Sequence, residues 1–227
     1  MATYVLIPGA GSDSWCWHLV APELAARGHD VVAVDLPCDD DTAGLAEYTD
    51  AVVDATRDRR DLVLVAQSMG AFTAPLVCDR LPVDMVVLVA AMVPAPGERP
   101  GDWWANTGQL QAQRAQAERD GRDPDDEDPA TLFLHDVPPE VVAESASRVR
   151  AQSGTPFEKP WPRHAWPDVP TRFLLCRHDR LFPADFQRRV VRERLGIVPD
   201  EMDGGHLPAL ARPRELAQRL LAYRAER

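Results

Sequence analysis

Cysteine is scarce in this chain, and long hydrophobic runs are missing. The four cysteines, Cys16, Cys38, Cys78 and Cys176, are scattered through 227 residues, with no C-x-x-C pair and no histidine at metal-ligand spacing. This pattern argues against a disulfide framework or a zinc site and favours a reducing compartment. No apolar run approaches 18 residues, and the one near the N-terminus is too short for a signal peptide. We therefore expect a soluble, cytoplasmic protein that needs no metal.

Positive charge is also in short supply. Lys and Arg number 25 against 36 Asp and Glu, which gives a net charge of −11. Such a chain repels polyphosphate and anionic lipid, so we expect neither nucleic acid nor a membrane as partner. Hydrophobic residues make up 45% of the chain, enough to bury a core at this length. A single α/β domain with a small-molecule substrate is expected, and a monomer and a homodimer both stay open.

Short apolar runs rich in β-branched residues alternate with longer amphipathic segments along most of the chain. This alternation is typical of a parallel sheet with helices on both faces. The expected strands are residues 4–7, 30–35, 62–66, 85–90, 171–176 and 196–201. The expected helices are residues 18–27, 42–59, 69–80, 184–195 and 208–224.

The alternation stops between residues 94 and 169, where prolines and charges accumulate. Residues 110–119 and 139–150 read as polar helices within this stretch, separated by the acidic run 123–128. Long segments outside the main pattern are usually functional, so we expect a helical lid over a site. A solvated helical decoration is the alternative. The core would then comprise residues 1–93 and 170–227.

The stretch Leu64-Val65-Ala66-Gln67-Ser68-Met69-Gly70 carries the most chemical information. A buried strand ends at Ser68, small residues lie two positions to either side, and a helix follows. This is the layout of a nucleophile elbow, in which a sharp strand-to-helix turn lifts a serine hydroxyl above the sheet. Ala66 departs from the usual glycine by a single methyl group. A serine that only caps the helix is the structural alternative.

A serine hydroxyl needs a base, and the base needs an orienting acid. Asp179 follows the expected strand 171–176, and His206 lies in the glycine-rich turn Asp203-Gly204-Gly205-His206. The carboxyl ends of parallel strands face one crevice, so residues that are distant in sequence can converge there. Asp179 could instead cap the next loop or pair with Arg180, and a lone histidine is often structural.

Together these residues resemble the α/β-hydrolase fold, whose order of nucleophile, acid and base is matched by Ser68, Asp179 and His206. The resemblance covers nearly the whole chain. It is closest to the branch of small esterases and hydroxynitrile lyases, which share a loop like Pro8-Gly9-Ala10-Gly11 followed by Trp15-Cys16-Trp17. It implies a sheet of about six mostly parallel strands, a helical lid and no cofactor.

By the same resemblance, the backbone N–H groups of Ala10 and Met69 would form an oxyanion hole. The family usually has histidine just before Gly9, where this chain has Pro8, which lacks an N–H and fixes φ. Cyanohydrin lyases of the branch place lysine after the catalytic histidine, where this chain has Leu207. The resemblance therefore favours an esterase over a lyase.

Aromatic side chains gather in the segments expected around the site, as is usual for pockets that hold small apolar molecules. These tryptophans could equally fill the interface between lid and core. The candidate substrate-binding residues are Trp15, Trp17, Trp103, Trp104, Phe133, His135 and Trp161.

We predict a serine hydrolase of the carboxylesterase type that cleaves a small apolar ester through an acyl-enzyme. The alternative is a hydrolase-like protein that binds or tailors a metabolite, including by lyase chemistry, without ester hydrolysis.

Overall fold

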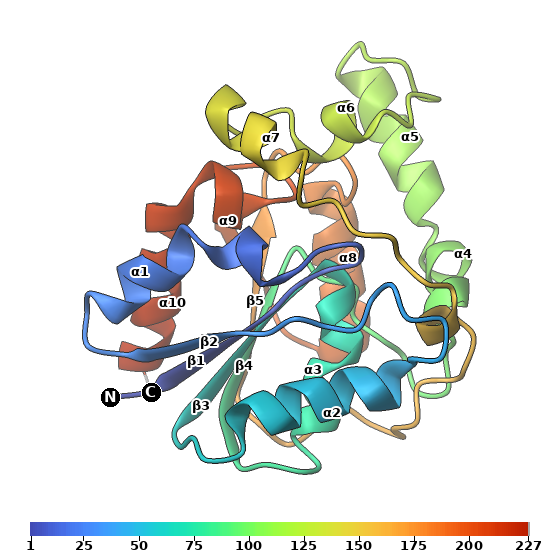
Figure 1. Ribbon diagram of the computed structural model, residues 1–227. Helices are drawn as coiled ribbons and strands as arrows, with labels where there is room; N and C mark the ends of the chain where they lie inside the picture. Colours follow the sequence, from blue (N-terminus) through green and yellow to red (C-terminus); the bar gives the residue numbers. More distant parts are fainter. Residues whose placement is uncertain (227) are drawn as a thin grey trace.

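The computed structural model describes residues 1–226, whose strands form one six-stranded parallel sheet (Figure 1). Arg227, the last residue of the predicted core, lies outside the described residues. The strand order is β2-β1-β3-β4-β5-β6. The prediction of six strands is therefore confirmed, and all neighbouring pairs are parallel. The strands are β1 (Thr3–Ile7), β2 (Asp30–Ala33), β3 (Leu62–Gln67), β4 (Val83–Val89), β5 (Thr171–Cys176) and β6 (Asp200–Met202).

Helices cover both faces of the sheet, as the sequence predicts. Successive side chains of a strand point to opposite faces, so Val63 and Val65 pack in one core cluster and Leu62 and Leu64 in the other. The first face is covered by α1 (Val20–Ala25) and α10 (Pro213–Ala225). The second is covered by α2 (Leu45–Thr56), α3 (Ala74–Val77) and α8 (Ala184–Leu195). Burial on both faces explains why the central strands are continuous apolar runs.

Two predicted helices are interrupted in the structure, each where a proline lies in the first turn of the next helix. The segment 69–80 forms the 3-10 helix η2 (Ser68–Phe72) and then α3, which carries Pro75 in its first turn. The last predicted helix is divided into α9 (Pro208–Ala211) and α10, which begins at Pro213. Proline cannot donate a helical hydrogen bond, so it is favoured in a first turn and breaks a helix interior. The predicted helix 18–27 is shorter in the structure, where it is α1, and the 3-10 helix η1 (Ser14–Trp17) precedes it.

The predicted strand 196–201 is wrong at its beginning. Gly196 ends α8 with a left-handed φ of 68°, and β6 begins only at Asp200. A glycine at this position satisfies the helix end without the steric cost that a side chain would carry. The apolar Ile197 and Val198 therefore belong to a connection and not to the sheet.

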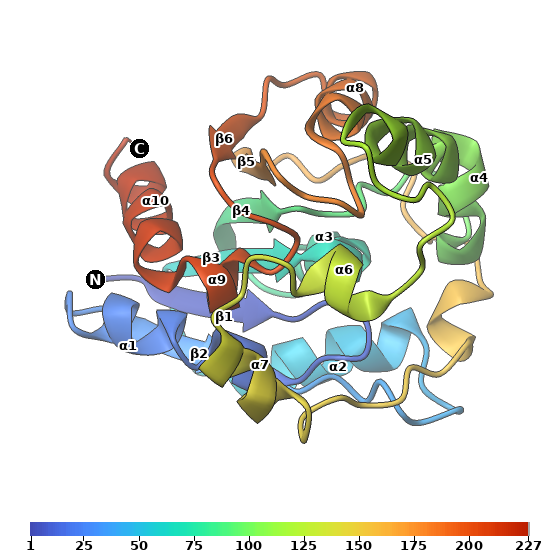
Figure 2. The same ribbon diagram turned by 90° about the horizontal axis from the view of Figure 1, so that it is seen from above.

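Residues 94–169 add no strand to the sheet. Their helices α5, α6 and α7 lie beyond the end of the sheet toward which the strands run (Figures 1 and 2). The helical elements of this insertion are η3 (Pro100–Asp102), α4 (Trp103–Thr107), α5 (Gln109–Arg119), α6 (Pro129–Phe133), α7 (Pro139–Ser145) and η4 (Thr155–Phe157). The acidic run 123–128 connects α5 to α6, and Asp125 pairs with Arg114. A lid role for this insertion stays a prediction.

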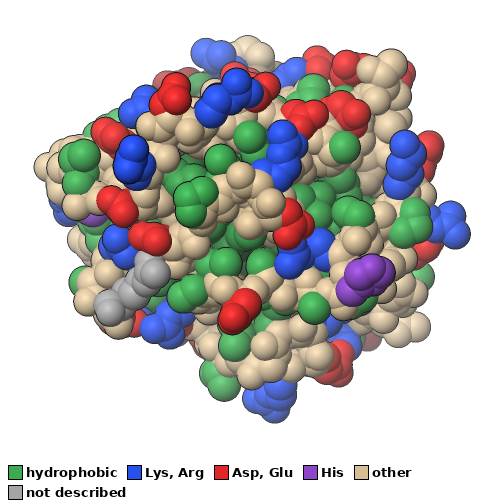
Figure 3. Space-filling model, turned by 90° about the horizontal axis from the view of Figure 1, so that it is seen from below, with side chains coloured by type: hydrophobic (Ala, Val, Ile, Leu, Met, Phe, Trp, Pro, Cys, Tyr) green, Lys and Arg blue, Asp and Glu red, His purple; other side chains and the backbone are tan. Residues whose placement is uncertain are grey.

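The face seen from below the view of Figure 1 carries positive and negative side chains interspersed around an apolar centre (Figure 3). No broad region of one sign is visible on this face. Within residues 1–226, no helix is both long enough and apolar enough to cross a membrane.

Candidate active site

Ser68 stands at the turn between β3 and η2, in a backbone conformation that few side chains adopt. Its φ is 51°, which is in the left-handed region. The turn needs small neighbours: a Cβ added to Gly70 would lie 2.8 Å from the carbonyl oxygen of Pro8. Ala66 fits as the last but one residue of β3 and is fully buried. The elbow therefore forms despite the methyl group at that position.

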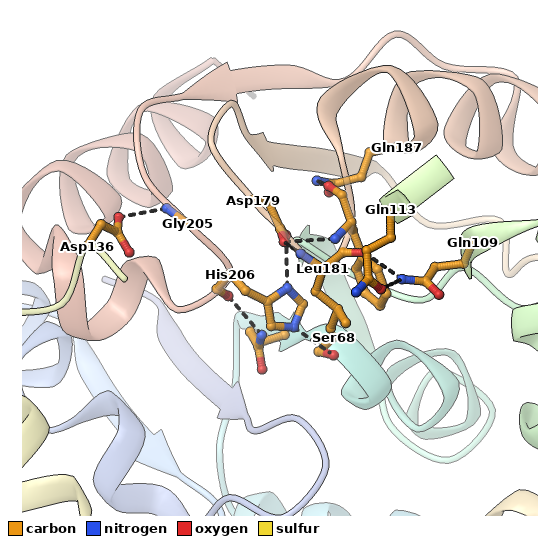
Figure 4. A network of polar contacts seen from close by, with 11 residues as sticks. Ser68, Gln109, Gln113, Asp136, Asp179, Leu181, Gln187, Gly205 and His206 are labelled. Atoms are coloured by element: carbon orange, nitrogen blue, oxygen red, sulfur yellow. Dashed lines mark hydrogen bonds and ion pairs between the residues drawn. The ribbon is translucent and has the colours of Figure 1, made fainter. Parts of the chain in front are cut away.

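Ser68, His206 and Asp179 meet in one hydrogen-bonded series (Figure 4). The Ser68 Oγ lies 3.2 Å from His206 Nε2, and His206 Nδ1 lies 2.8 Å from Asp179 Oδ2. The other oxygen of Asp179 accepts the backbone N–H groups of Leu181 at 2.9 Å and Phe182 at 2.8 Å. The three residues follow β3, β5 and β6, respectively, and the fold brings them together.

The contacts of the two ring nitrogens favour one tautomer of His206. Because the Asp179 carboxylate accepts at Oδ2, Nδ1 of His206 is the donor, and the free lone pair of Nε2 faces the Ser68 hydroxyl. This is the tautomer that a general base needs when it activates a serine. The His206 and Asp179 side chains are each about 2% exposed or less, so bulk water does not compete for these bonds.

Two residues around the histidine were not foreseen from the sequence. Gln67, which directly precedes Ser68, donates from Nε2 to the carbonyl oxygen of His206 at 3.1 Å. The Phe182 ring meets the His206 ring edge-on at a centroid distance of 4.9 Å. Gln67 carries a polar side chain at the end of a buried apolar strand, and this was the one available signal for its role.

A cavity of about 370 Å³ opens beside Ser68 and His206. Of the residues predicted from the sequence, Ala10 and Met69 of the oxyanion hole and Trp15, Trp104 and Phe133 line it. Met69 lies in the first turn of η2, where backbone N–H groups have no partner within the helix. The rest of the wall is mostly apolar and includes Met92, Phe157, Leu181, Leu207 and Leu210.

Four residues predicted to bind substrate lie elsewhere. Trp17, Trp103 and Trp161 are almost fully buried and pack in the hydrophobic core, and none of them lines the cavity. The indoles of Trp103 and Trp161 donate to the carbonyl oxygens of Val93 at 2.9 Å and Phe72 at 3.0 Å, respectively. These two tryptophans join the insertion to the core, which is the interface alternative that the sequence left open.

His135 also lies away from the cavity wall. Its Nε2 is buried behind Gly205, without a hydrogen-bond partner among residues 1–226. Burial and the nearby Arg180 guanidinium lower the pKa of His135. His135 therefore packs against the loop that carries His206 without lining the cavity.

Other reactive groups near the cavity are few. Burial, together with the charges of Asp13 and Asp35, raises the pKa of the Cys16 thiol, so this cavity-lining cysteine stays protonated and weakly nucleophilic. Arg148 lies at the cavity wall with its guanidinium 6.0 Å from the centre of the Trp15 ring. In the described part of the chain, no three His, Cys, Asp or Glu side chains are grouped to hold a metal ion.

Comparisons with known proteins agree with this geometry. A family model described as "Alpha/beta hydrolase family" matches residues 4–219. Methylesterase 3 of Arabidopsis thaliana is 25% identical over 255 residues, covering 96% of this chain and 94% of the relative. Norfluorocurarine synthase 1 of a Strychnos species is 23% identical over 269 residues, covering 95% and 92%. The solved pyrethroid hydrolase of Sphingobium faniae JZ-2 superposes with a TM-score of 0.79 at 22% identity, covering 98% and 96%.

Proposed function

Because the chain belongs to the alpha/beta hydrolase family, we propose that it is a serine hydrolase that cleaves a small apolar carboxylic ester. The observation that carries the proposal is the series from Ser68 through His206 to Asp179, which opens into a mostly apolar cavity. The chain is also similar over almost its full length to proteins named as methylesterases.

In the proposed mechanism, His206 Nε2 takes the proton of the Ser68 hydroxyl as Oγ attacks the ester carbonyl carbon. The N–H groups of Ala10 and Met69 stabilise the negative charge that develops on the carbonyl oxygen. His206 then gives the proton to the departing alkoxide, which leaves Ser68 acylated. Water, activated by the same histidine, releases the acid. Asp179 holds the imidazole in the required tautomer throughout.

Labelling with a fluorophosphonate tests the proposal directly, because this reagent reacts much faster with an activated serine than with an ordinary hydroxyl group. We expect one adduct in the intact mass of the parent protein and none in Ser68→Ala. His206→Ala should label far more slowly. Both variants should lower kcat/KM for nitrophenyl esters by about 10⁴-fold or more, since the triad acts as a unit.

His178→Ala is the matched control, because His178 adjoins the acid but its side chain is 63% exposed. It should label and turn over ester like the parent. A parent protein with neither adduct nor ester turnover would contradict the hydrolase proposal. That outcome would favour binding or tailoring of a metabolite, and one relative is indeed named as a synthase.

A further inference from the structure

One acidic side chain of the insertion reaches the loop that carries His206. Asp136 follows α6, and its Oδ2 accepts the backbone N–H of Gly205 at 2.7 Å (Figure 4). Gly205 directly precedes His206 in the chain. A hydrogen bond to an ionised acceptor is short and about twice as strong as a neutral one, so this contact can fix a backbone position.

The same loop is held from two other sides. The carbonyl oxygen of Gly204 accepts the N–H of His178, in the loop of Asp179, at 3.0 Å. The carbonyl oxygen of His206 accepts from Gln67 beside Ser68 at 3.1 Å. Gly204 has a φ of 121°, a conformation that glycine alone adopts readily, so the loop gains little order from its own backbone. The position of His206 is therefore set by external contacts, and Asp136 supplies the contact from the insertion.

Asp136 also lies directly against Gly205. A Cβ added at Gly205 would be 2.6 Å from Asp136 Oδ1 and 2.7 Å from His135 Nε2. Both of these atoms are buried and have no hydrogen-bond partner among the described residues. A buried polar atom without a partner destabilises the fold. Stability alone therefore does not account for Asp136, whereas its bond to the histidine loop gives it a role.

We propose that Asp136 is a positioning residue, which acts through the Gly205 N–H to hold the His206 imidazole between Ser68 and Asp179. The inference rests on the proposed function and extends it, because it makes alignment of the triad depend on docking of residues 133–137. Two further bonds hold the insertion on the acid loop: Arg180 donates to the Thr131 carbonyl at 3.2 Å, and Gln109 donates to the Leu181 carbonyl at 2.6 Å. The insertion thus contacts both loops that orient the base.

Substitution of Asp136 tests the proposal. Asp136→Ala should lower kcat for a nitrophenyl ester by about 10- to 100-fold with KM changed less than about 2-fold, since small displacements of a catalytic group have effects of this order. Asp136→Asn keeps an oxygen that can accept the Gly205 N–H and should recover most of the activity. If Asp136→Ala does not fold, Asp136→Leu removes the acceptor while keeping the shape, and should show the same loss.

A second readout does not depend on turnover. The proton on His206 Nδ1, bonded to Asp179, is observable by proton NMR and is identified by its loss in His206→Ala. It should shift or broaden in Asp136→Ala and be restored in Asp136→Asn. This signal separates the two proposals, because it responds to Asp136 even in a protein that forms no fluorophosphonate adduct.

Asp128→Ala is the matched control, because Asp128 caps α6 in the same insertion without touching the histidine loop. It should leave kcat and the Nδ1 proton signal unchanged. The proposal is overturned if folded Asp136→Ala or Asp136→Leu keeps the parent kcat and the parent proton signal. An equal loss of kcat in Asp128→Ala would also overturn the proposal, because the loss in Asp136→Ala would then reflect a general loosening of the insertion.

Discussion

At the scale of single residues, the elbow depends on a close approach between two backbones. Ser68 holds a positive φ, which costs of the order of 1 to 3 kcal/mol for a residue with a side chain. The strain is kept because the Pro8 carbonyl and the Ile7 side chain close against Gly70 from the other side. Pro8, which looked like a departure from the family pattern, therefore forms part of the wall that supports Ser68.

Gly70→Ala should disturb this wall. The added methyl group would have to displace the Pro8 carbonyl, which is backbone and cannot rotate away. We expect a loss of about 1 to 3 kcal/mol in the free energy of unfolding, as for overpacked sites. A fall in kcat should accompany it, because Pro8 is joined through Gly9 to the proposed oxyanion donor Ala10. Urea unfolding and ester kinetics measure the two effects.

Gly154→Ala provides the comparison for this experiment. Gly154 has ordinary right-handed angles and nothing within 4 Å of the added Cβ. The free energy of unfolding of Gly154→Ala should differ from that of the parent by less than about 0.5 kcal/mol, and its ester kinetics should equal those of the parent. If Gly70→Ala behaved like Gly154→Ala, the supporting role of the close approach would be wrong.

At the scale of elements, the sequence predicted what a repeating pattern can express. The central strands could be predicted because a sheet covered on both faces requires continuous apolar runs. Ser68 and Asp179 were proposed because they follow such runs, whereas His206 was proposed from its glycine-rich turn, since the short strand β6 before it is polar. Breaks in helices were missed, although Pro213 and Pro75 were visible, because the apolar pattern continues across them. The tryptophans could not be assigned, since an indole fills a core as readily as it lines a cavity, and only the packing separates Trp15 from Trp17.

The insertion is joined to α8 by a buried ion pair between Glu98 and Arg194. The two side chains are only 4% and 14% exposed, and their atoms approach to 2.5 and 2.8 Å. Burial would raise the pKa of Glu98, but the hydrogen bonds from Arg194 and Asn106 outweigh it and hold the pKa below its ordinary value of 4.5. The charged form of Glu98 is therefore stabilised by folding.

Glu98→Gln should destabilise the protein by about 3 kcal/mol at pH 7, because it leaves the buried Arg194 without its counter-charge. A group whose pKa is lower in the folded than in the unfolded protein stabilises the folded state at pH values above its pKa in the unfolded protein. This contribution is lost as the pH falls through its pKa in the folded protein. The difference in the free energy of unfolding between the parent and Glu98→Gln should therefore be constant at neutral pH and shrink below about pH 4.5. Urea unfolding from pH 7 to pH 3.5 measures it.

The exposed Glu158 supplies the control for this ion pair. Glu158→Gln should leave the free energy of unfolding within about 0.5 kcal/mol of the parent at every pH. If the free energies of unfolding of Glu98→Gln and the parent differed by a constant amount down to pH 3.5, the ion pair would not account for the loss of stability in acid.

At the scale of the whole molecule, the site is assembled from segments that are far apart in the sequence. The cavity is closed by the loop after β1, the elbow after β3, the insertion and the turn after β6. It lies in a molecule of net charge −11, and Arg148 is the one cationic side chain in its wall among the described residues. The wall also includes Asp13, so a charged substrate meets the distant net charge and, nearby, one guanidinium and one carboxyl group.

The net charge should dominate the approach of an ester. For a nitrophenyl ester that carries a terminal carboxylate, we expect kcat/KM to rise about 2- to 10-fold between 10 and 300 mM salt, because salt screens long-range repulsion first. A neutral ester of similar size should show no such change, and it serves as the control. Arg148→Gln should steepen the salt dependence of the anionic ester, since it removes the local attraction. If kcat/KM for the anionic ester fell with salt, Arg148 would outweigh the net charge, and the cavity would be better suited to substrates that carry an acid group.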